Sequence, residues 1–218
     1  MKLAAIISGG KDSLYAAYLA SRENEIEYLI SLVSDGVFNE PNSHLIRQQA
    51  AMMGIPLMEK KTSVGKEFED LEELLTSIRD DVDGIVFGSL ASNMKKMEID
   101  AICKRLGLLP IAPLWHLEPS SYIPKMIEDG FDVIFVGARQ PLGKEWLGRK
   151  LDGTALGELV GLNKKHGINV AGEGGEYDTF VTDCPLFVRK LEVLWAESKW
   201  DGKSGIYDIK KIELSSKN

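Results

Sequence analysis

Strand-like and helix-like segments alternate along the first half of the chain, and this order limits the possible folds more than any other feature of the sequence. Apolar runs typical of buried strands occupy residues 3–8, 27–34, 55–62, 84–90 and 108–115. Segments typical of helices lie between them, at 13–22, 42–54, 66–80 and 92–107. Strands joined through helices pair in parallel and are covered on both faces. With right-handed crossovers, the order predicts a doubly wound α/β domain with a parallel five-stranded sheet over residues 1–118.

Capping signals mark the ends of two helices in this domain. Asn42 is expected to cap the start of one helix and Gly54 to end it. Ser92 and Gly107 are expected to do the same for the helix at 92–107. One face of that helix is expected to carry Met94, Met97, Ala101, Ile102 and Leu106.

The second half of the chain does not continue the regular alternation of strands and helices. A helix at 120–130 and a strand at 132–139 are followed by a helix at 154–167. Two further strands, 187–195 and 205–213, surround a turn at "DGKSG". Without a repeat or a low-complexity linker, these elements predict a second, smaller α/β domain over residues 119–218.

The charge balance bears on the class of partner. The formal net charge is −7, so the chain has no global basic field for nonspecific binding of nucleic acid. A local basic patch around Lys144, Arg149 and Lys150 remains compatible with the sequence. We therefore expect no nucleic-acid partner. The sequence leaves open whether the chain forms a homodimer.

Cysteine and histidine usage indicates a reducing compartment. Cys103 and Cys184 are far apart and form no C-x-x-C pattern, so we expect reduced thiols. The three histidines are scattered, which argues against a zinc site. We find neither a signal-peptide core nor a membrane-spanning stretch, and we expect a cytoplasmic protein without a membrane partner.

The hexapeptide "SGGKDS" at residues 8–13 connects the first predicted strand to the first predicted helix. Ligands bind at such junctions in open parallel sheets, where N–H groups at the helix start attract anions. Gly9 and Gly10 allow close approach of a phosphate, Lys11 adds a charge, and the hydroxyls of Ser8 and Ser13 add donors. The spacing fits neither the P-loop nor the dinucleotide fingerprint. A plain glycine turn is the simpler alternative.

Asp12 is unusual in such a loop because its carboxylate repels phosphate. A magnesium ion, which prefers carboxylate and phosphate oxygens together, removes this conflict. We therefore expect Asp12 to contact Mg²⁺.

A second stretch, "GEGGEYDTF", places Glu173, Glu176 and Asp178 within six residues. Such carboxylates repel one another unless they bind a cation, share a proton or receive a positively charged substrate. Beside Tyr177, they could attract a cation through charge and through the aromatic ring. One of them could also deprotonate an ammonium ion. A solvated acidic turn before a strand is the simpler alternative.

The segment "WLGR" carries Trp146 and Arg149, which share a face if the segment is helical. Arg149 could hold a phosphate or a carboxylate as a fork, or it could be a surface residue beside a structural Trp. His44 fits a structural or substrate-lining residue better than a base. Lys95 and Lys96 fit a solvated helix face, although one could reach a phosphate.

At its position after the first strand, "SGGKDS" resembles the PP-loop of the N-type ATP pyrophosphatases, whose fold is adenine nucleotide α-hydrolase-like. This resemblance implies cleavage of ATP between the α- and β-phosphates and adenylation of a substrate oxygen.

Four longer stretches narrow the resemblance to the diphthine–ammonia ligase family, over essentially the whole chain. They are "PNSHLIRQQAAMMGIPL" (41–57), "GSLASNMKKMEIDAICKRLGLLPIAPLWH" (88–116), "WLGRKLD" (146–152) and "AGEGGEYDTFVTDCPLF" (171–187). The resemblance implies that ATP and ammonium convert diphthine on translation elongation factor 2 to its amide. The length resembles that of the compact archaeal form. Position 178 is Asp where the family pattern has Glu, so the carboxylate that reaches metal or substrate stays open.

The site expected from residues and resemblance together has three parts. Its nucleotide-binding residues are Ser8, Gly9, Gly10, Lys11, Asp12, Ser13, Ser34 and Gly88. Its substrate-binding residues are His44, Trp115, Trp146, Arg149, Gly174, Gly175, Tyr177 and Thr179. Its catalytic residues are Lys11, Asp12, Glu173, Glu176 and Asp178, with ATP and Mg²⁺ as co-substrate and cofactor. Another adenylating ligase, for example one acting on tRNA, and a non-catalytic ATP or AMP sensor are the alternatives.

Overall fold

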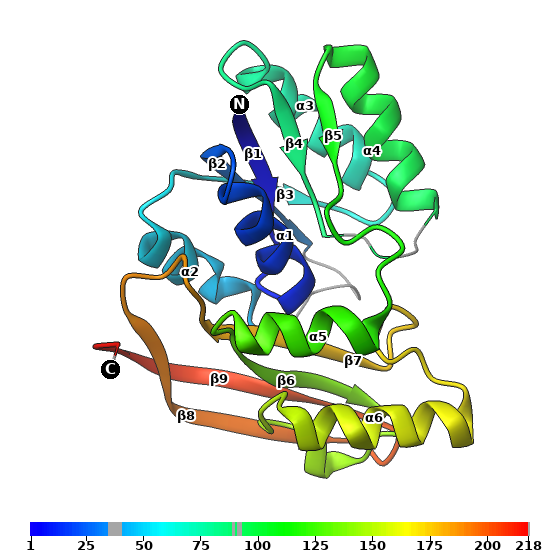
Figure 1. Ribbon diagram of the computed structural model, residues 1–218. Helices are drawn as coiled ribbons and strands as arrows, with labels where there is room; N and C mark the ends of the chain where they lie inside the picture. The colour runs from blue at the N-terminus through cyan, green and yellow to red at the C-terminus, as the bar shows by residue number, and fades with distance from the viewer. Residues whose placement is uncertain (35–40, 89, 91–92, 218) are drawn as a thin grey trace. The chain divides into compact units, whose positions relative to one another are not determined.

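The computed structural model describes residues 1–34, 41–88, 90 and 93–217 (Figure 1). Contacts within the chain divide it into two units. The first unit consists of Met1–Ser8 with Asp12–His116, and the second consists of Gly9–Lys11 with Leu117–Asn218. Across the described residues, no helix is long and apolar enough to cross a membrane.

The first unit contains the predicted five-stranded parallel sheet, in the order β3-β2-β1-β4-β5. The strands are β1 (Lys2–Ile6), β2 (Glu25–Ser34), β3 (Leu57–Thr62), β4 (Gly84–Val86) and β5 (Leu109–Ile111). The helices are α1 (Lys11–Ser21), α2 (Ile46–Met53), α3 (Glu67–Ile78) and α4 (Asn93–Leu106), with a short 3₁₀ turn η1 (Ser43–Leu45) before α2. This arrangement confirms the predicted fold class of the first half.

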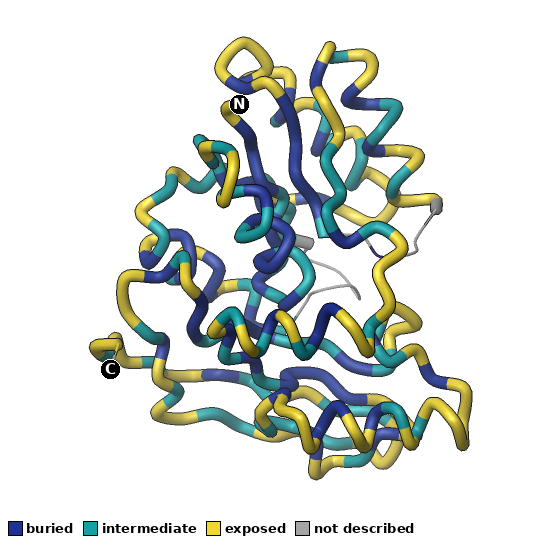
Figure 2. Tube along the Cα trace, in the orientation of Figure 1, coloured by how far each residue is buried: buried dark blue, intermediate teal, exposed yellow. Residues whose placement is uncertain are grey.

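The central strands are buried on both faces, as helices on each side of the sheet require. Leu3, Ala4 and Ala5 of β1 are consecutive, and all three are fully buried. Ala4, Ile30 and Ile85 pack in one cluster with apolar side chains of α3 and α4. The tube in Figure 2 accordingly shows β1 and β4 as buried segments. Covering on both faces explains why these strands read as continuous apolar runs.

Helix ends follow the predicted signals only in part. Gly54 ends α2 in the left-handed conformation, with φ of 66°, and Gly107 follows α4 with φ of 75°. Asn42 precedes η1 with φ of 69°, but its side chain makes no capping hydrogen bond, so its predicted capping role is wrong. The left-handed backbone of Asn42 differs from the extended conformation of a side-chain cap. Ser92 lies outside the described residues.

The predicted buried face of α4 is partly wrong. Met94 and Met97 are each 70% exposed. The helix instead buries Ile99, Ile102 and Cys103 against the sheet, and Leu106 packs against the same cluster. Spacings of three and four residues connect these positions, so the apolar stripe begins one turn later than predicted.

Strands β4 and β5 end earlier than the apolar runs suggested. β4 ends at Val86 and β5 at Ile111, whereas the runs continue to residues 90 and 115. After β5 the chain turns, since the Trp115 N–H donates to the carbonyl of Ala112 at 3.1 Å. The remaining apolar residues therefore form connections at the carboxyl end of the sheet.

The second unit is built on a four-stranded antiparallel sheet in the order β7-β6-β9-β8. Its elements are α5 (Pro119–Glu128), β6 (Asp132–Arg139), η2 (Lys144–Trp146), α6 (Gly153–His166), β7 (Tyr177–Asp183), β8 (Lys190–Trp200) and β9 (Ser204–Ser215). The predicted turn joins β8 to β9, where the Asp201 carboxylate accepts N–H groups from Lys203 and Ser204 at 2.8 Å each. Asp152 caps the start of α6, and its carboxylate accepts the Ala155 N–H at 2.8 Å.

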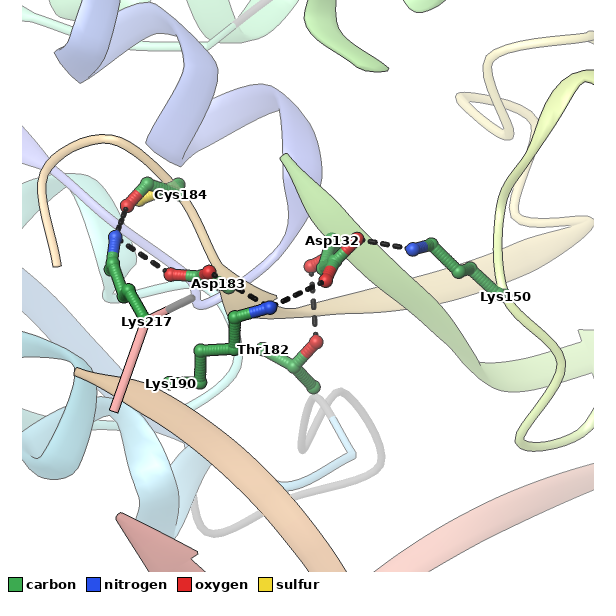
Figure 3. A network of polar contacts seen from close by, with 7 residues as sticks. All are labelled: Asp132, Lys150, Thr182, Asp183, Cys184, Lys190 and Lys217. Carbon is green, nitrogen blue, oxygen red and sulfur yellow. Dashed lines mark hydrogen bonds and ion pairs between the residues drawn. The ribbon is translucent and has the colours of Figure 1, made fainter. Parts of the chain in front are cut away.

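A network of charges ties β6, β7 and β8 to the segment after β9 (Figure 3). Asp132 and Asp183 lie opposite each other on paired strands, and the Lys190 ammonium lies 3.9 and 3.8 Å from their carboxylates. Lys217 donates to the Cys184 carbonyl at 2.5 Å and pairs with Asp183 at 2.8 Å. Because each carboxylate faces at least one ammonium, the cluster is locally compensated and holds the strand ends together.

Both cysteines are free thiols in the interior. Burial raises the pKa of Cys103 from its ordinary value of 9.0 to about 11, and that of Cys184 to about 12. The folded state therefore retains these protons longer than the unfolded chain. The corresponding stabilisation is complete below pH 9.0 and is lost as the pH rises through about 11 and 12.

We expect neither thiol to react with iodoacetamide in the folded protein at pH 8, because the reactive thiolate is suppressed and shielded. Mass spectrometry should show no adduct on the folded protein and two adducts after unfolding in guanidinium. Rapid labelling of the folded protein would contradict the burial of these thiols.

Candidate functional site

The order of strands in the first unit singles out one position on its sheet. From β1 the chain proceeds to β2 and β3 on one side, and then returns to β4 and β5 on the other. β1 and β4 are therefore the neighbouring strands where the order reverses, and ligands of open α/β sheets bind beyond the carboxyl ends of such strands. "SGGKDS" follows β1 at this point, and Gly88 follows β4.

Gly88 lies in direct contact with the start of α1. A Cβ atom on Gly88 would lie 2.3 Å from the Asp12 carbonyl oxygen and 2.6 Å from the Ser13 nitrogen. Only glycine leaves room for these backbones to meet. The connection after β4 therefore meets the start of α1 at Gly88.

Two serines close the loop across the start of α1. The Ser13 hydroxyl accepts the Ser8 N–H at 3.1 Å, and the two hydroxyl oxygens lie 3.3 Å apart. Gly9 adopts φ of 85°, a left-handed conformation that favours glycine. The loop thus bends at Gly9 and directs the chain into a helix whose first N–H groups carry partial positive charge.

Residues Gly9–Lys11 of this loop make their contacts with the second unit and are part of it. The carbonyl of Gly9 accepts the Val181 N–H at 3.0 Å, and the Lys11 N–H donates to the Thr179 hydroxyl at 3.2 Å. Both partners lie on β7. Thr179, predicted to bind substrate, here fixes the backbone of Lys11.

The Lys11 side chain is 2% exposed. Its ammonium donates to the Ala171 carbonyl at 2.6 Å and lies 5.1 Å from the centre of the Tyr177 ring. Tyr177 is itself anchored, since its hydroxyl donates to the Val170 carbonyl at 2.6 Å. Lys11 and the "GEGGEYDTF" stretch are thus brought together, although 160 residues separate Lys11 from Ala171.

The three predicted acidic residues have three different environments. Glu173 is exposed. Glu176 accepts the Asn169 N–H on Oε1 at 2.7 Å, while its Oε2 is buried and has no hydrogen-bond partner among the described residues. A buried carboxylate oxygen without a donor is costly, which indicates a place for a donor that comes with a ligand.

Asp178 is held by an arginine that the sequence analysis did not identify. Arg139 Nη1 donates to the Gly175 carbonyl at 2.6 Å and to the Asp178 carboxylate at 3.2 Å. On the facing strand, a Cβ atom on Gly137 would lie 2.1 Å from Asp178 Oδ2. Arg139 and Gly137 therefore determine the position of the Asp178 carboxylate.

Trp146 and Arg149 stack, but not on a helix. η2 ends at Trp146, and Gly148 bends the chain with φ of 78°. The Arg149 guanidinium lies 4.7 Å from the Trp146 ring centre and forms a two-pronged pair with Glu158, at 2.7 Å on each prong. Hydrogen bonding to Glu158 raises the pKa of Arg149, and the same bond lowers that of Glu158. The Arg149 guanidinium, which was expected to bind a ligand, thus binds Glu158.

The other residues predicted to bind nucleotide or substrate lie on different elements of the chain. His44 is exposed in η1, and Trp115 is half-buried after β5. Gly175 bends the acidic stretch with φ of 82°, and a Cβ atom on Gly174 would lie 2.5 Å from Glu176 Oε1. The side chain of Ser34, at the end of β2, lies outside the described part of the chain. Among the described residues, no three His, Cys, Asp or Glu side chains are grouped to hold a metal ion.

We expect Gly88→Ala to displace the first turn of α1, because the added methyl group overlaps two backbone atoms. The loss of stability should be about 1–3 kcal/mol, together with weaker ATP binding. Urea unfolding and calorimetric titration with ATP measure both effects. Gly157→Ala in α6 is the control, since nothing lies within 4 Å of its added methyl group, and alanine there should stabilise by up to about 1 kcal/mol. If Gly88→Ala bound ATP as tightly as the parent protein does, the close contact at Gly88 would be contradicted.

We expect Arg139→Ala to loosen the "GEGGEYDTF" stretch, because the carbonyl of Gly175 and the carboxylate of Asp178 lose their shared donor. Amide hydrogen exchange at residues 172–178 should become about 3–10-fold faster, as for the loss of one hydrogen bond. Arg22→Ala, at an exposed position of the first unit, is the control. Unchanged exchange would show that Arg139 does not hold this stretch.

Comparison with known proteins matches both halves of the chain to one family. Residues 1–110 match the family described as diphthamide synthase N-terminal domain, and residues 118–214 match the diphthamide synthase C-terminal domain. A protein from Rattus norvegicus named diphthine–ammonia ligase is 32% identical over 249 residues, which cover 99% of this chain and 91% of the relative.

Proteins of the same name from Bos taurus and Homo sapiens are each 33% identical, over 88% of this chain and 83% of the relative. The two matched domains together cover most of the sequence, and the chain belongs to the diphthamide synthase family.

Proposed function

We propose that the chain catalyses the ATP-dependent amidation of diphthine on translation elongation factor 2. Ammonium supplies the nitrogen, and diphthamide, AMP and pyrophosphate are the products. The observation that carries this proposal is the position of "SGGKDS" where the strand order reverses, in contact with Gly88. The family match and the name shared by the relatives support the choice of substrate.

The nucleotide site consists of the loop at residues 8–13 and the start of α1. We assign the β- and γ-phosphates to the positive end of α1 and to the hydroxyls of Ser8 and Ser13. The Lys11 N–H is not among the phosphate donors, because it donates to Thr179. Asp12 is half-buried in the first turn of α1. A single carboxylate fits Mg²⁺, because this ion takes most of its other ligands from phosphates and water. When bound at Asp12, Mg²⁺ neutralises phosphate charge.

The reaction proceeds through an acyl-adenylate. A carboxylate oxygen of diphthine forms a bond to the α-phosphorus, and the bond from that phosphorus to the bridging oxygen of pyrophosphate breaks. Ammonia then attacks the activated carbonyl carbon, and AMP leaves with the electron pair of the broken C–O bond. Lys11 stabilises negative charge that develops on the phosphates. Its burial makes this charge more effective than that of a solvated lysine.

Glu176 is the residue that we assign to ammonium. The nucleophile must lose one proton before its nitrogen can attack, and a carboxylate in contact with it can accept that proton. Glu176 Oε2 is buried without a hydrogen-bond partner in the described structure, whereas Asp178 is paired with Arg139 and Glu173 is exposed. The proton therefore moves to Glu176 Oε2, and Asp178 orients the stretch.

We assign ATP cleavage and substrate binding to different domains. We propose that residues 1–118 form the ATP pyrophosphatase domain and that residues 119–218 bind the substrate. Diphthine carries a trimethylammonium group, which carboxylates and the Tyr177 ring attract. Because the substrate is a translation factor, we place the reaction in the cytoplasm.

We expect the protein to produce AMP and pyrophosphate from ATP when diphthine-bearing elongation factor 2 and ammonium are present. Chromatography of the nucleotides and mass spectrometry of the factor measure the two products. ADP and phosphate would overturn the PP-loop chemistry. AMP without an amide on the factor would overturn only the choice of substrate, and no turnover at all would favour a nucleotide sensor.

In the same assay, Glu176→Gln should lower amide formation by about 10²–10⁴-fold, the range for loss of a general base. ATP binding should be unchanged, because among the described residues the Glu176 carboxylate accepts from the Asn169 N–H, outside the loop at residues 8–13. Glu173→Gln, three residues earlier in the same stretch, is the matched control. It should keep activity within about twofold because Glu173 is exposed. Equal losses in both variants would remove the assignment to Glu176.

A further inference from the structure

Two neighbouring lysines of α4 have different environments. Lys95 is exposed, as expected for a solvated helix face. The Lys96 side chain is only 27% exposed and forms an ion pair with Asp100, one turn further along the helix. Its ammonium also lies 5.5 Å from the centre of the Trp115 ring. Lys96 is therefore held in one place, whereas Lys95 is exposed and no ion pair or ring contact holds it among the described residues.

The Trp115 ring is positioned by a constrained turn after β5. The His116 N–H donates to the Leu90 carbonyl at 2.9 Å, and the His116 ring meets the Trp115 ring edge-on at 4.6 Å. His116 has φ of 60°, a left-handed conformation that is uncommon outside glycine. Such backbone strain persists where the surroundings hold it in place, and it is concentrated at functional sites.

This cluster lies on the same edge of the sheet as the phosphate loop. Trp115 follows the carboxyl end of β5, and the Leu90 carbonyl that fixes its neighbour belongs to the connection between β4 and α4. Gly88 of that connection contacts Asp12 and Ser13. All these contacts are within the first unit, where Gly88 meets the start of α1 and Leu90 meets the residue next to Trp115.

A simple helix-surface ion pair does not explain the arrangement. Exposed pairs four residues apart contribute only about 0.3–0.5 kcal/mol and need no aromatic platform. Asp100 Oδ1 is buried and has no hydrogen-bond partner in the part of the chain that is described, although Oδ2 pairs with Lys96. An ammonium has three N–H donors, and one carboxylate oxygen and a ring face leave donor capacity for a ligand.

We propose that Lys96, Trp115 and Asp100 form a subsite for an anionic group, a carboxylate or a phosphate oxygen, of a ligand bound at this edge of the sheet. Lys96 donates to the anion. Trp115 and Asp100 are positioning residues that keep the ammonium at the edge and out of solvent. This inference rests on the proposed function, in which both a carboxylate and a polyphosphate must be bound there.

The test compares Lys96→Met with Lys95→Met in two binding titrations that do not depend on turnover. In the first, calorimetry measures the affinity for pyrophosphate and for ATP with Mg²⁺. In the second, it measures the affinity for elongation factor 2 bearing diphthine. Loss of a charged donor should weaken one of these by about tenfold or more in Lys96→Met. Lys95→Met should remain within about twofold of the parent protein.

The two titrations identify the source of the anion. Weaker pyrophosphate or ATP binding by Lys96→Met assigns the subsite to phosphate, and weaker binding of the factor alone assigns it to the carboxylate. Affinities that match those of Lys95→Met in both titrations overturn the subsite, as does a parent protein that binds none of these probes. If the parent protein binds these probes but forms no AMP, the proposed function is refuted. The titrations of Lys96→Met and Lys95→Met then still decide whether the subsite exists.

Two further variants keep the test valid if Lys96→Met unfolds, which circular dichroism would show. Lys96→Arg preserves the charge and should regain at least part of the lost affinity, because a guanidinium also donates to anions. Trp115→Phe preserves an aromatic platform of smaller area and should weaken the same probe less than Lys96→Met does. Affinity lost equally in Lys96→Arg and Lys96→Met, both folded, would contradict a role for the charge.

Discussion

The approach of the Gly88 backbone to Asp12 and Ser13 is the contact on which the first unit's site depends. It occurs where the strand order reverses, and it brings the connection after β4 against the helix start that follows β1. Any side chain larger than hydrogen at position 88 would separate the two. Gly88 permits this approach of two backbones, and Gly9 permits the left-handed bend of the loop before α1.

Carboxylates that look equivalent in the sequence acquire different chemistry from their neighbours. In the "GEGGEYDTF" stretch, an arginine compensates Asp178, and Glu173 lies at an exposed position. Glu176 retains one buried oxygen that accepts no hydrogen bond from the described residues. These differences arise from backbone amides and side chains that lie 7 to 39 residues away along the chain. The same principle separates Lys95 from Lys96, which are adjacent in the sequence but differ in burial and partners.

Most of the fold was predictable because apolar periodicity and glycine stops are local signals. The order of strands and helices in the first unit, the stop at Gly54 and the β8–β9 turn were predicted correctly, whereas β7 (Tyr177–Asp183) was not assigned from the sequence. The errors arose where tertiary contacts override local pattern. Met94 and Met97 are apolar and helical, yet the buried stripe of α4 begins at Ile99, where the helix meets α3 and the sheet. A helix's apolar spacing shows that it has a buried side, but not at which turn burial begins.

The candidate site was less predictable, for a physical reason. Lys11 and Asp12 could be proposed as site residues because glycines and a lysine at a strand–helix junction have a chemical meaning within six residues. Arg139 carries no such signal, since it ends a strand far from Asp178 in sequence and only antiparallel pairing brings the two together. Lys95 and Lys96 were expected on a solvated face, with one of them able to reach a phosphate. Helical position did not indicate which one, because it does not reveal the Trp115 ring beside Lys96. Residues that act through long-range contacts thus require the folded arrangement, and these are the residues that orient the site.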